Sequence, residues 1–488
     1  MAVATALQHV GFGLLLTLIA AYYLLLLSNG TFQVFAPEML DKAFDNMLLH
    51  LLRGEFTVDR DAIGYEAFTR DGKTYAYFGI FPAILRVVAL PFTNIGQAEL
   101  ARLSCLTAVV IFVGLQLRML VIVHRSLPPA SRRPEYLTVM VVATMLSGPQ
   151  IYILSSALIY HEAVLWSAAM AAAFNLIIVR TTFGAKTMRG RDLVSLAVLA
   201  GLAINTRASI GVALYLGTTL LLAWAVWHRY ASDRTARQVS ARPARFSSAI
   251  LPAIGVLGLA AAVAGFINFE RWGNPFSFAD FHYYDMRLDA YQTLFEVTRK
   301  YGEFGVGRIP IGALYYLTDL PYLLHTVQPF AGFLHARVVT IDGPPNSPIV
   351  TNPLTLILAG IGLYRVWWKP DLSTQSLPIL RLALLGHAAA VVLVLGYFFF
   401  TMRYRFDFTP FTTLAAVIGF RSVSIRSAEA GQFWRRRVLI AAISLCLVGV
   451  VFSHYELIPN KVYGWVVPMD VRLRLLPFAP FAHYMFNR

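Results

Sequence analysis

The sequence predicts an all-α integral membrane protein with about eleven transmembrane helices. The chain has 488 residues, of which 57% are hydrophobic and only 14% charged, whereas soluble domains are about a quarter charged. Apolar runs near the length of a membrane span recur along it. Basic residues cluster in the short loops between these runs, as is typical of cytoplasmic loops. We therefore expect one polytopic domain over residues 1–488.

The apolar runs place the expected helices along the chain. They fall at residues 9–28, 99–123, 136–154, 162–180, 193–207, 209–227, 247–267, 353–368, 379–400, 408–424 and 438–455. The first run follows an N-terminus without a basic stretch or a small-residue cleavage site, so we interpret it as a retained span.

The formal net charge of +15 does not indicate a nucleic-acid partner here. The basic residues concentrate in four short loops, at 125–133, 180–191, 229–245 and 421–437. All four fall on one side if the N-terminus is cytoplasmic, as the positive-inside rule requires. The two cysteines lie inside predicted spans, so neither a disulfide framework nor a cysteine zinc site is expected.

Two long loops, residues 29–98 and 268–352, fall on the opposite, outer side. Loops of this length are usually functional. Prolines break the apolar stretch 309–333 in the second long loop, and we interpret that stretch as helices lying in the membrane interface. The run 193–227 is interrupted at Arg207, and a charge is costly in hydrocarbon. Two helices joined by a tight turn would bring Arg207 to the outer surface.

An amphipathic helix is predicted at 37–53 in the first long loop, with Pro37 at its start and Gly54 after its end. The polar face carries Glu38, Asp41 and Asp45. These acids could simply face water on an interfacial helix. The functional interpretation is a general base held above the head group of a lipid substrate.

Two further groups of polar residues lie at span ends. His161 and Glu162 follow Tyr160 in a very short outer loop. Ionisable residues at the edge of a span suggest a functional site. The alternative is that the loop is too short to bury any polar residue. Three outer arginines, Arg207, Arg403 and Arg405, run against the positive-inside trend. Guanidinium groups bind phosphate bidentately, so a phosphate is the functional interpretation. Pairing with Asp407, Glu270 or a lipid phosphate is the alternative.

Four local motifs follow one another along the chain. Residues 45–54 read DNMLLHLLRG, residues 71–82 read DGKTYAYFGIFP, residues 271–276 read RWGNPF, and Arg403-Tyr404 precedes Pro410-Phe411. In this order, and with this layout of spans and loops, they resemble the C-type glycosyltransferase superfamily, polytopic enzymes that use polyprenyl-phosphate sugars. Motifs for nucleotide phosphates, serine hydrolases and dithiol chemistry are missing.

The resemblance implies transfer of a sugar, with inversion, from a polyprenyl-phosphate donor to a hydroxyl of a glycan, lipid or protein at the outer face of the membrane. It implies an acidic base in the first outer loop, here Asp45 or Asp41. Many members carry adjacent Asp-Glu at that point, and this chain does not. Substrate contacts are expected from His161, Glu162, Arg207, Arg403, Arg405, Tyr404, Lys73 and Tyr77. Membrane lipids are the other partners. A bacterial inner membrane is the expected location, and a divalent cation at the phosphate is left open.

Two other classes of protein fit part of the pattern. A transporter or flippase of a lipid-linked or anionic substrate would also need buried arginines, but would usually show two related halves, and no internal repeat is visible. In a non-catalytic scaffold the polar residues would only be solvated span ends. Nothing in the sequence indicates which sugar is moved or which acceptor receives it.

Overall fold

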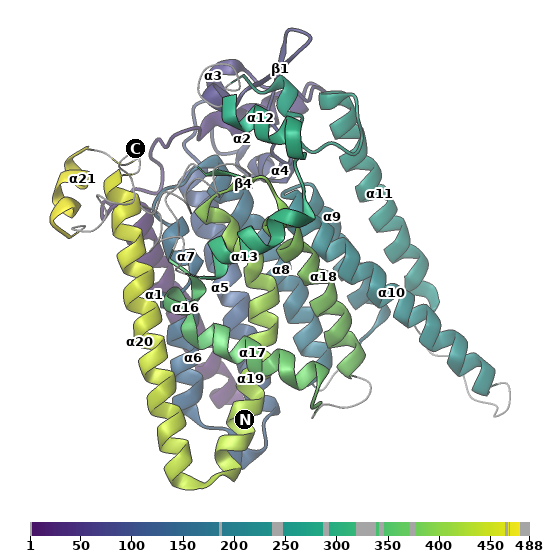
Figure 1. Ribbon diagram of the computed structural model, residues 1–488, viewed down its shortest axis with the longest axis vertical. Helices are drawn as coiled ribbons and strands as arrows, with labels where there is room; N and C mark the ends of the chain where they lie inside the picture. Colours follow the sequence, from purple (N-terminus) through teal and green to yellow (C-terminus); the bar gives the residue numbers. More distant parts are fainter. Residues whose placement is uncertain are drawn as a thin grey trace.

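Long helices running side by side make up most of the chain (Figure 1). The computed structural model describes residues 2–184, 188–236, 247–285, 292–318, 338–340, 346–370, 376–463, 467 and 469–478. The helices of the bundle are α1 (Ala2–Leu27), α5 (Ala101–Ser126), α6 (Pro134–Leu146), α7 (Pro149–Ile153), α8 (Ile159–Phe183), α9 (Gly190–Ile204), α10 (Ala208–Ala236), α11 (Ser247–Trp272), α17 (Pro353–Trp367), α18 (Ser376–Gly396), α19 (Thr409–Glu429) and α20 (Gly431–Tyr463).

The predicted fold class is confirmed. Within the described residues, eight helical stretches are long and apolar enough to cross a membrane, and 11–27 and 353–367 form shorter apolar helices. With α9, these elements cover all eleven apolar runs expected from the sequence. Both α9 and α17 have 15 residues, so each is about 22 Å long and too short to cross about 30 Å of hydrocarbon alone.

Close helix contacts in the bundle depend on small residues. Helices α17 and α19 cross where Gly362 faces the carbonyl of Ala415, and Gly419 faces that of Leu358. A Cβ atom at either glycine would lie 1.9 Å from the opposing oxygen, so only glycine permits this approach. Small residues are what membrane helices use to bring their backbones together.

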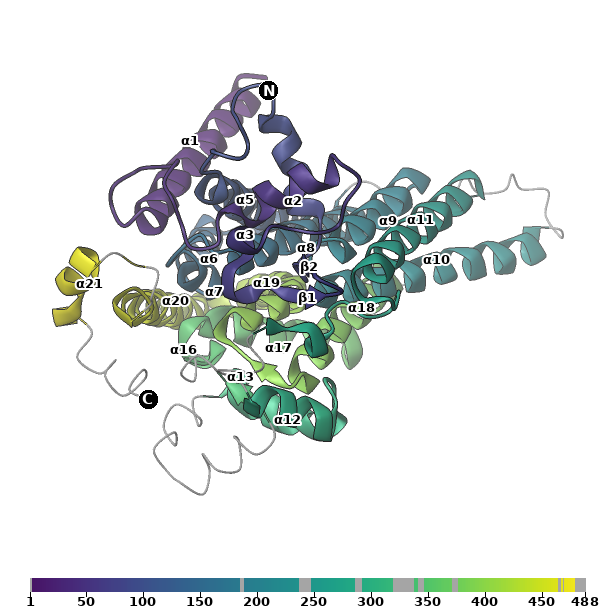
Figure 2. The same cartoon turned by 90° about the horizontal axis from the view of Figure 1, so that it is seen from above.

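The two ends of the bundle differ in kind. The described parts of the four basic loops lie at the lower end of the bundle in Figure 1. Residues 185–187 and 237–246 of these loops are outside the described residues. The two long loops meet at the upper end, and Figure 2 shows the first of them lying across the ends of the bundle helices. This grouping agrees with the predicted arrangement of loops.

The first long loop is built of short elements around its own apolar core. They are α2 (Lys42–Leu51), α3 (Arg60–Ile63), η1 (Gly64–Glu66), β1 (Phe68–Arg70), β2 (Lys73–Tyr75), α4 (Phe81–Leu85) and η2 (Arg86–Ala89). Strands β1 and β2 pair antiparallel around Asp71 and Gly72, which both have positive φ. This is the backbone that a two-residue hairpin turn requires.

The described parts of the second long loop and of the C-terminal region are also short. They are η4 (Phe281–Tyr283), α12 (Gln292–Tyr301), η6 (Val306–Arg308), α13 (Ile309–Leu317), β3 (Val339–Thr340), α16 (Pro348–Thr351), β4 (Phe399–Phe400), η7 (Met402–Phe408), α21 (Met469–Leu475) and η8 (Leu476–Phe478), with η3 (Pro129–Ser131) at the other end. Strands β3 and β4 pair in parallel. Of the predicted interfacial helices at 309–333, the structure describes α13. Residues 319–333 lie outside the described residues.

The helix expected at 37–53 begins later and is buried. Leu40 has φ of +60°, which α-helical backbone excludes, so α2 starts at Lys42 and Pro37 is not its first residue. Two of its acids do not face water, because Asp41 is 9% and Asp45 1% exposed. The apolar stripe, including Phe44 and Met47, packs into the core of the first long loop. Gly54 ends this segment with φ of +78°.

Candidate functional site: an arginine-lined cavity

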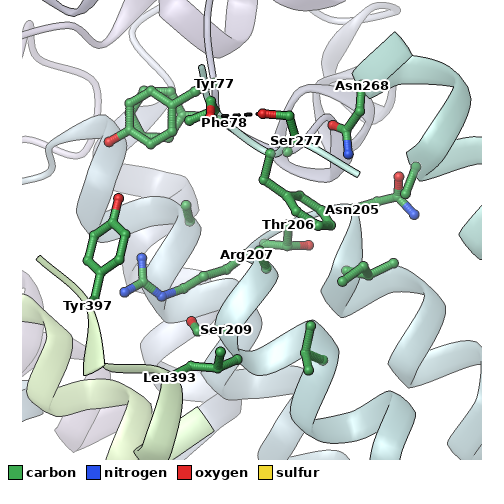
Figure 3. Close-up of a pocket in the computed structure, with 18 of the residues that line it drawn as sticks. Tyr77, Phe78, Asn205, Thr206, Arg207, Ser209, Asn268, Ser277, Leu393 and Tyr397 are labelled. Atoms are coloured by element: carbon green, nitrogen blue, oxygen red, sulfur yellow. Dashed lines mark hydrogen bonds between the residues drawn. The ribbon is translucent and has the colours of Figure 1, made fainter. Parts of the chain in front are cut away.

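A cavity of about 550 Å³ lies where the two long loops meet the upper ends of α9, α10, α11 and α18 (Figure 3). Its walls toward the bundle are apolar and come from Ile204, Val212, Ala264, Ile267, Leu393 and Val394. Its charged lining consists of Arg207, Arg271, Arg403, Asp407 and Glu303. Three guanidinium groups against two carboxylates give this part of the lining a net positive charge. The cavity can therefore hold a molecule with an apolar tail and an anionic head.

The turn between α9 and α10, which the sequence predicted, places Arg207 in the cavity lining. Arg207 Nε and Nη2 donate to the two carboxylate oxygens of Asp407 over 2.8 and 2.7 Å, and Ser209 donates to the same carboxylate over 3.0 Å. Pairing with Asp407, the alternative to a phosphate role, is therefore present. Figure 3 shows the Arg207 side chain between Tyr397 and the backbone of the turn, with Tyr77 above it.

Arg403 enters the cavity from η7, the segment before α19. Its guanidinium carbon lies 4.2 Å from the ring centre of Tyr160 and 5.6 Å from that of Tyr404. The guanidinium carbon of Arg207 also lies over the Tyr404 ring, 4.9 Å from its centre. Tyrosine rings attract cations through their faces, so the aromatic residues hold two positive charges close together. Tyr77, Tyr160 and Tyr404 all line the cavity.

Arg271 is a cavity residue that the sequence analysis did not select, although it opens the motif at 271–276. It is 2% exposed, and its Nη1 donates to the carbonyl of Phe78 over 2.8 Å. Its Nε is buried without a hydrogen-bond partner. An unpaired buried donor is costly, and an acceptor oxygen of a ligand in the cavity would relieve that cost.

Gly79 fixes the first long loop on the cavity. A Cβ atom at this position would lie 2.2 Å from the carbonyl oxygen of Asn205. Two residues later, the Phe81 N–H donates to the same carbonyl over 2.9 Å. The segment carrying Tyr77 and Phe78 therefore sits directly on the α9–α10 turn, and only glycine allows this close approach.

The acids predicted as bases lie outside the cavity lining. Asp45 Oδ1 accepts from Arg86 Nε over 2.8 Å, and its Oδ2 is buried without a hydrogen-bond partner. Burial raises the pKa of Asp45 to about 6, and the charge of Arg86 opposes that rise. Asp41 accepts from the Glu38 N–H over 2.7 Å. Burial raises its pKa to about 7, with a further rise from the neighbouring Glu99.

Glu162 and His161 also belong to buried clusters beside the cavity. Arg86, which Asp45 binds, also makes a two-pronged contact with the Glu162 carboxylate. Ser104 donates to Glu162 over 2.5 Å. His161 Nδ1 donates to the carbonyl of Ser156 over 2.7 Å. The two residues that flank the pair, Tyr160 and Ala163, line the cavity instead.

Arg405 and Lys73 lie farther from the cavity. Arg405 is 3% exposed, contacts the carbonyl of Asn346 and pairs with Glu456 over 2.6 Å. Lys73 is exposed at the start of β2. The structure therefore brings Arg207, Arg403, Tyr404 and Tyr77 together among the residues expected to bind substrate. Asp45, Asp41, His161, Glu162, Arg405 and Lys73 lie around or away from that group.

Arg86 and Glu303 are the other residues that the sequence analysis missed. Arg86 is the one charged residue in the otherwise uncharged stretch 75–91, which could have indicated a buried partner for an acid. Glu303 has no such signal, because it lies in a polar part of the second long loop. Among the described residues, no group of three or more histidine, cysteine or acidic side chains could hold a metal ion.

The fold and the cavity define a polytopic helical membrane protein with a positively charged binding site at one end of its bundle. No protein-family model matches the chain, and no curated protein matches it in sequence. In structure the chain is similar to the Archaeoglobus fulgidus oligosaccharyltransferase tethered to an acceptor peptide, with 14% identity and a TM-score of 0.49 over 97% of this chain. It spans 59% of that protein.

Two other solved structures are similar to this chain. One is the same archaeal oligosaccharyltransferase, AglB, with an inhibitory peptide and a dolichol-phosphate, at 13% identity and a TM-score of 0.47 over 97% of this chain and 60% of that one. The other is ArnT from Cupriavidus metallidurans bound to undecaprenyl phosphate, at 11% identity and a TM-score of 0.40 over 97% and 84%.

Proposed function

We propose that this protein is a glycosyltransferase that moves a sugar from a polyprenyl-phosphate donor to an acceptor hydroxyl. The observation that carries the proposal is the cavity, which combines apolar walls from α10, α11 and α18 with three arginines at its loop end. A polyprenyl chain suits the apolar walls, and a phosphate at head-group level suits Arg207, Arg271 and Arg403.

The arginines would also support the reaction. When the bond between the sugar and the phosphate breaks, negative charge builds up on the phosphate oxygen. Fixed positive groups that face this charge stabilise the transition state. Arg271 Nε, buried without a partner, would gain a phosphate oxygen as acceptor. The acceptor hydroxyl must lose its proton as the new bond forms, which a nearby carboxylate can take.

The finer details follow from the resemblance in sequence. They are a single displacement with inversion and an active site on the outer face of a bacterial inner membrane. The resemblance also implies Asp45 or Asp41 as the base, although neither lies in the cavity lining. Asp45 could serve only if its contact with Arg86 gave way and a path to the cavity opened.

A transfer assay with the full-length protein in liposomes tests the proposal. Radiolabelled polyprenyl-phosphate mannose, glucose and arabinofuranose serve as donors, and an alkyl glycoside with free hydroxyls serves as acceptor. We expect a labelled glycoside and an equal amount of free polyprenyl phosphate from at least one donor. Movement of intact donor across the liposome membrane, without any cleavage, would identify a flippase instead.

Arg403→Ala supplies the matching variant, since it removes a charge-assisted contact worth about 2 kcal/mol. Donor affinity should fall about thirtyfold. The control is Arg299→Ala on α12, which removes an exposed arginine of the same loop region and should leave donor affinity unchanged. Equal donor affinity in both variants would contradict a phosphate site at Arg403.

A further inference from the structure

Glu303 is a loop residue whose backbone is held in place at the cavity. It lies between α12 and η6, and its carbonyl accepts from the Phe398 N–H over 2.9 Å. Arg308 Nη1 donates to the same carbonyl over 3.2 Å. Nearby, the Gly305 N–H donates to the carbonyl of Gly396 over 2.9 Å. These contacts fasten the segment to the end of α18, so the position of Glu303 does not depend on its carboxylate.

Glu303 is one of the two acidic residues in the cavity lining. The other, Asp407, is occupied by two hydrogen bonds from Arg207 and one from Ser209. Within the described part of the chain, Glu303 forms no salt bridge. A carboxylate already bound to a guanidinium is a weak base, because taking up a proton would end that favourable contact. Glu303 is therefore the cavity carboxylate better suited to accept a proton.

We propose that Glu303 is the general base of the transfer, a role that rests on the function proposed above. Its carboxylate takes the proton of the acceptor hydroxyl as the oxygen of that hydroxyl bonds to the anomeric carbon of the sugar. The bond from that carbon to the phosphate oxygen breaks, and its electron pair stays with the phosphate. Polyprenyl phosphate leaves beside Arg207, Arg271 and Arg403. The proton on Glu303 then passes to water.

The surroundings of Glu303 suit this role at neutral pH. Burial raises the pKa of Glu303 to about 7, the charge of Asp280 raises it further, and His282 lowers it. Among the described residues, Tyr397 directly after α18 and Arg308 from η6 also lie close to Glu303. A general base works best when its pKa lies near the working pH. Transfer should therefore increase with pH up to about 7 and then level off.

The test compares Glu303→Gln, Glu303→Asp and the control Glu296→Gln, an exposed acid on α12. Undecaprenyl phosphate binding, melting temperature and transfer rates between pH 5 and pH 9 are measured in the full-length protein. Because the backbone of Glu303 makes the loop contacts, Gln should preserve binding and melting temperature. We expect it to lower kcat about a hundredfold and to remove the rise in rate below pH 7. Asp should restore part of the rate, and Glu296→Gln should behave as wild type.

Transfer by Glu303→Gln within about threefold of the wild-type rate, or an unchanged rise in rate below pH 7, would overturn this role while leaving the glycosyltransferase proposal in place. Loss of undecaprenyl phosphate binding together with a lower melting temperature in Glu303→Gln would also overturn it, since the carboxylate would then be structural. Failure of the wild-type protein to cleave any donor would overturn the proposed function itself.

Discussion

Arg207 and Asp407, 200 residues apart in the chain, form a two-pronged ion pair at the cavity. The pair ties the α9–α10 turn to the segment before α19. Asp407 is 1% exposed, so its charge depends on this partner. Part of the positive charge of Arg207 is thereby balanced, which leaves Arg403 and Arg271 to supply most of the field that acts on a phosphate.

The ion pair gives the first prediction. Arg207→Met should destabilise the protein by about 3 kcal/mol or more, because it leaves the Asp407 carboxylate buried without its cation. In the double variant Arg207→Met with Asp407→Leu, most of that stability should return, because both charges are gone. Thermal unfolding in detergent measures the difference. Equal melting temperatures for the single and double variants would show that Asp407 does not depend on Arg207.

The second prediction separates Asp45 from Glu303. Asp45→Asn weakens a buried charge-assisted hydrogen bond to Arg86 and should lower stability by about 1–3 kcal/mol, with kcat reduced only a few-fold. The same should hold when Asp41→Asn is added, apart from a further loss of stability. A fall in kcat of about a hundredfold, at an unchanged melting temperature, would instead establish the base that the sequence predicted.

The third prediction concerns the seating of the first long loop. Gly79→Ala places a methyl group against the Asn205 carbonyl, and such overpacking typically costs about 1–3 kcal/mol. Tyr77 and Phe78 should be displaced from the cavity, so undecaprenyl phosphate should bind more weakly. Gly258→Ala is the control, because a Cβ atom there meets nothing within 4 Å. If Gly79→Ala binds and unfolds like Gly258→Ala, the close approach at Asn205 is unimportant.

Membrane orientation is the fourth prediction. A single cysteine placed at Thr69 or Lys300, both exposed in the long loops, should react with an impermeant thiol reagent from outside the cell. A cysteine at Ala130 in a basic loop should react only after the membrane is opened. The native Cys105 and Cys446 are buried, so background labelling should be low. The reverse pattern of labelling would invert the proposed sidedness.

The sequence predicted the fold well because hydropathy and loop charge act locally. A charge inside an apolar run must reach a surface, so the α9–α10 turn at Arg207 could be placed within a residue or two. Arg403 stood out because it broke the loop-charge pattern, and the pairing of Arg207 with Asp407 was among the alternatives considered.

The acids at the site were harder to place from the sequence. Asp45 was placed on the polar face of an amphipathic helix, yet it is buried and binds Arg86, 41 residues later. Helical periodicity cannot show such a partner. Glu303 reaches the cavity because its backbone bonds to Phe398, a contact far along the chain. Arg405 was expected at the cavity beside Arg403, but it turns instead toward Glu456. Long-range pairing, rather than local pattern, decides which charges line the site.

A structure of the full-length protein with undecaprenyl phosphate bound tests the central claim most directly. The account predicts a phosphate within hydrogen-bond distance of Arg403, with Arg271 Nε or Arg207 as a second donor, and a prenyl chain along Val212, Ala264 and Leu393. The Glu303 carboxylate should then face the open side of the phosphate, where an acceptor would enter. A phosphate bound outside this cavity, or a cavity that stays empty at saturating lipid, would contradict the account.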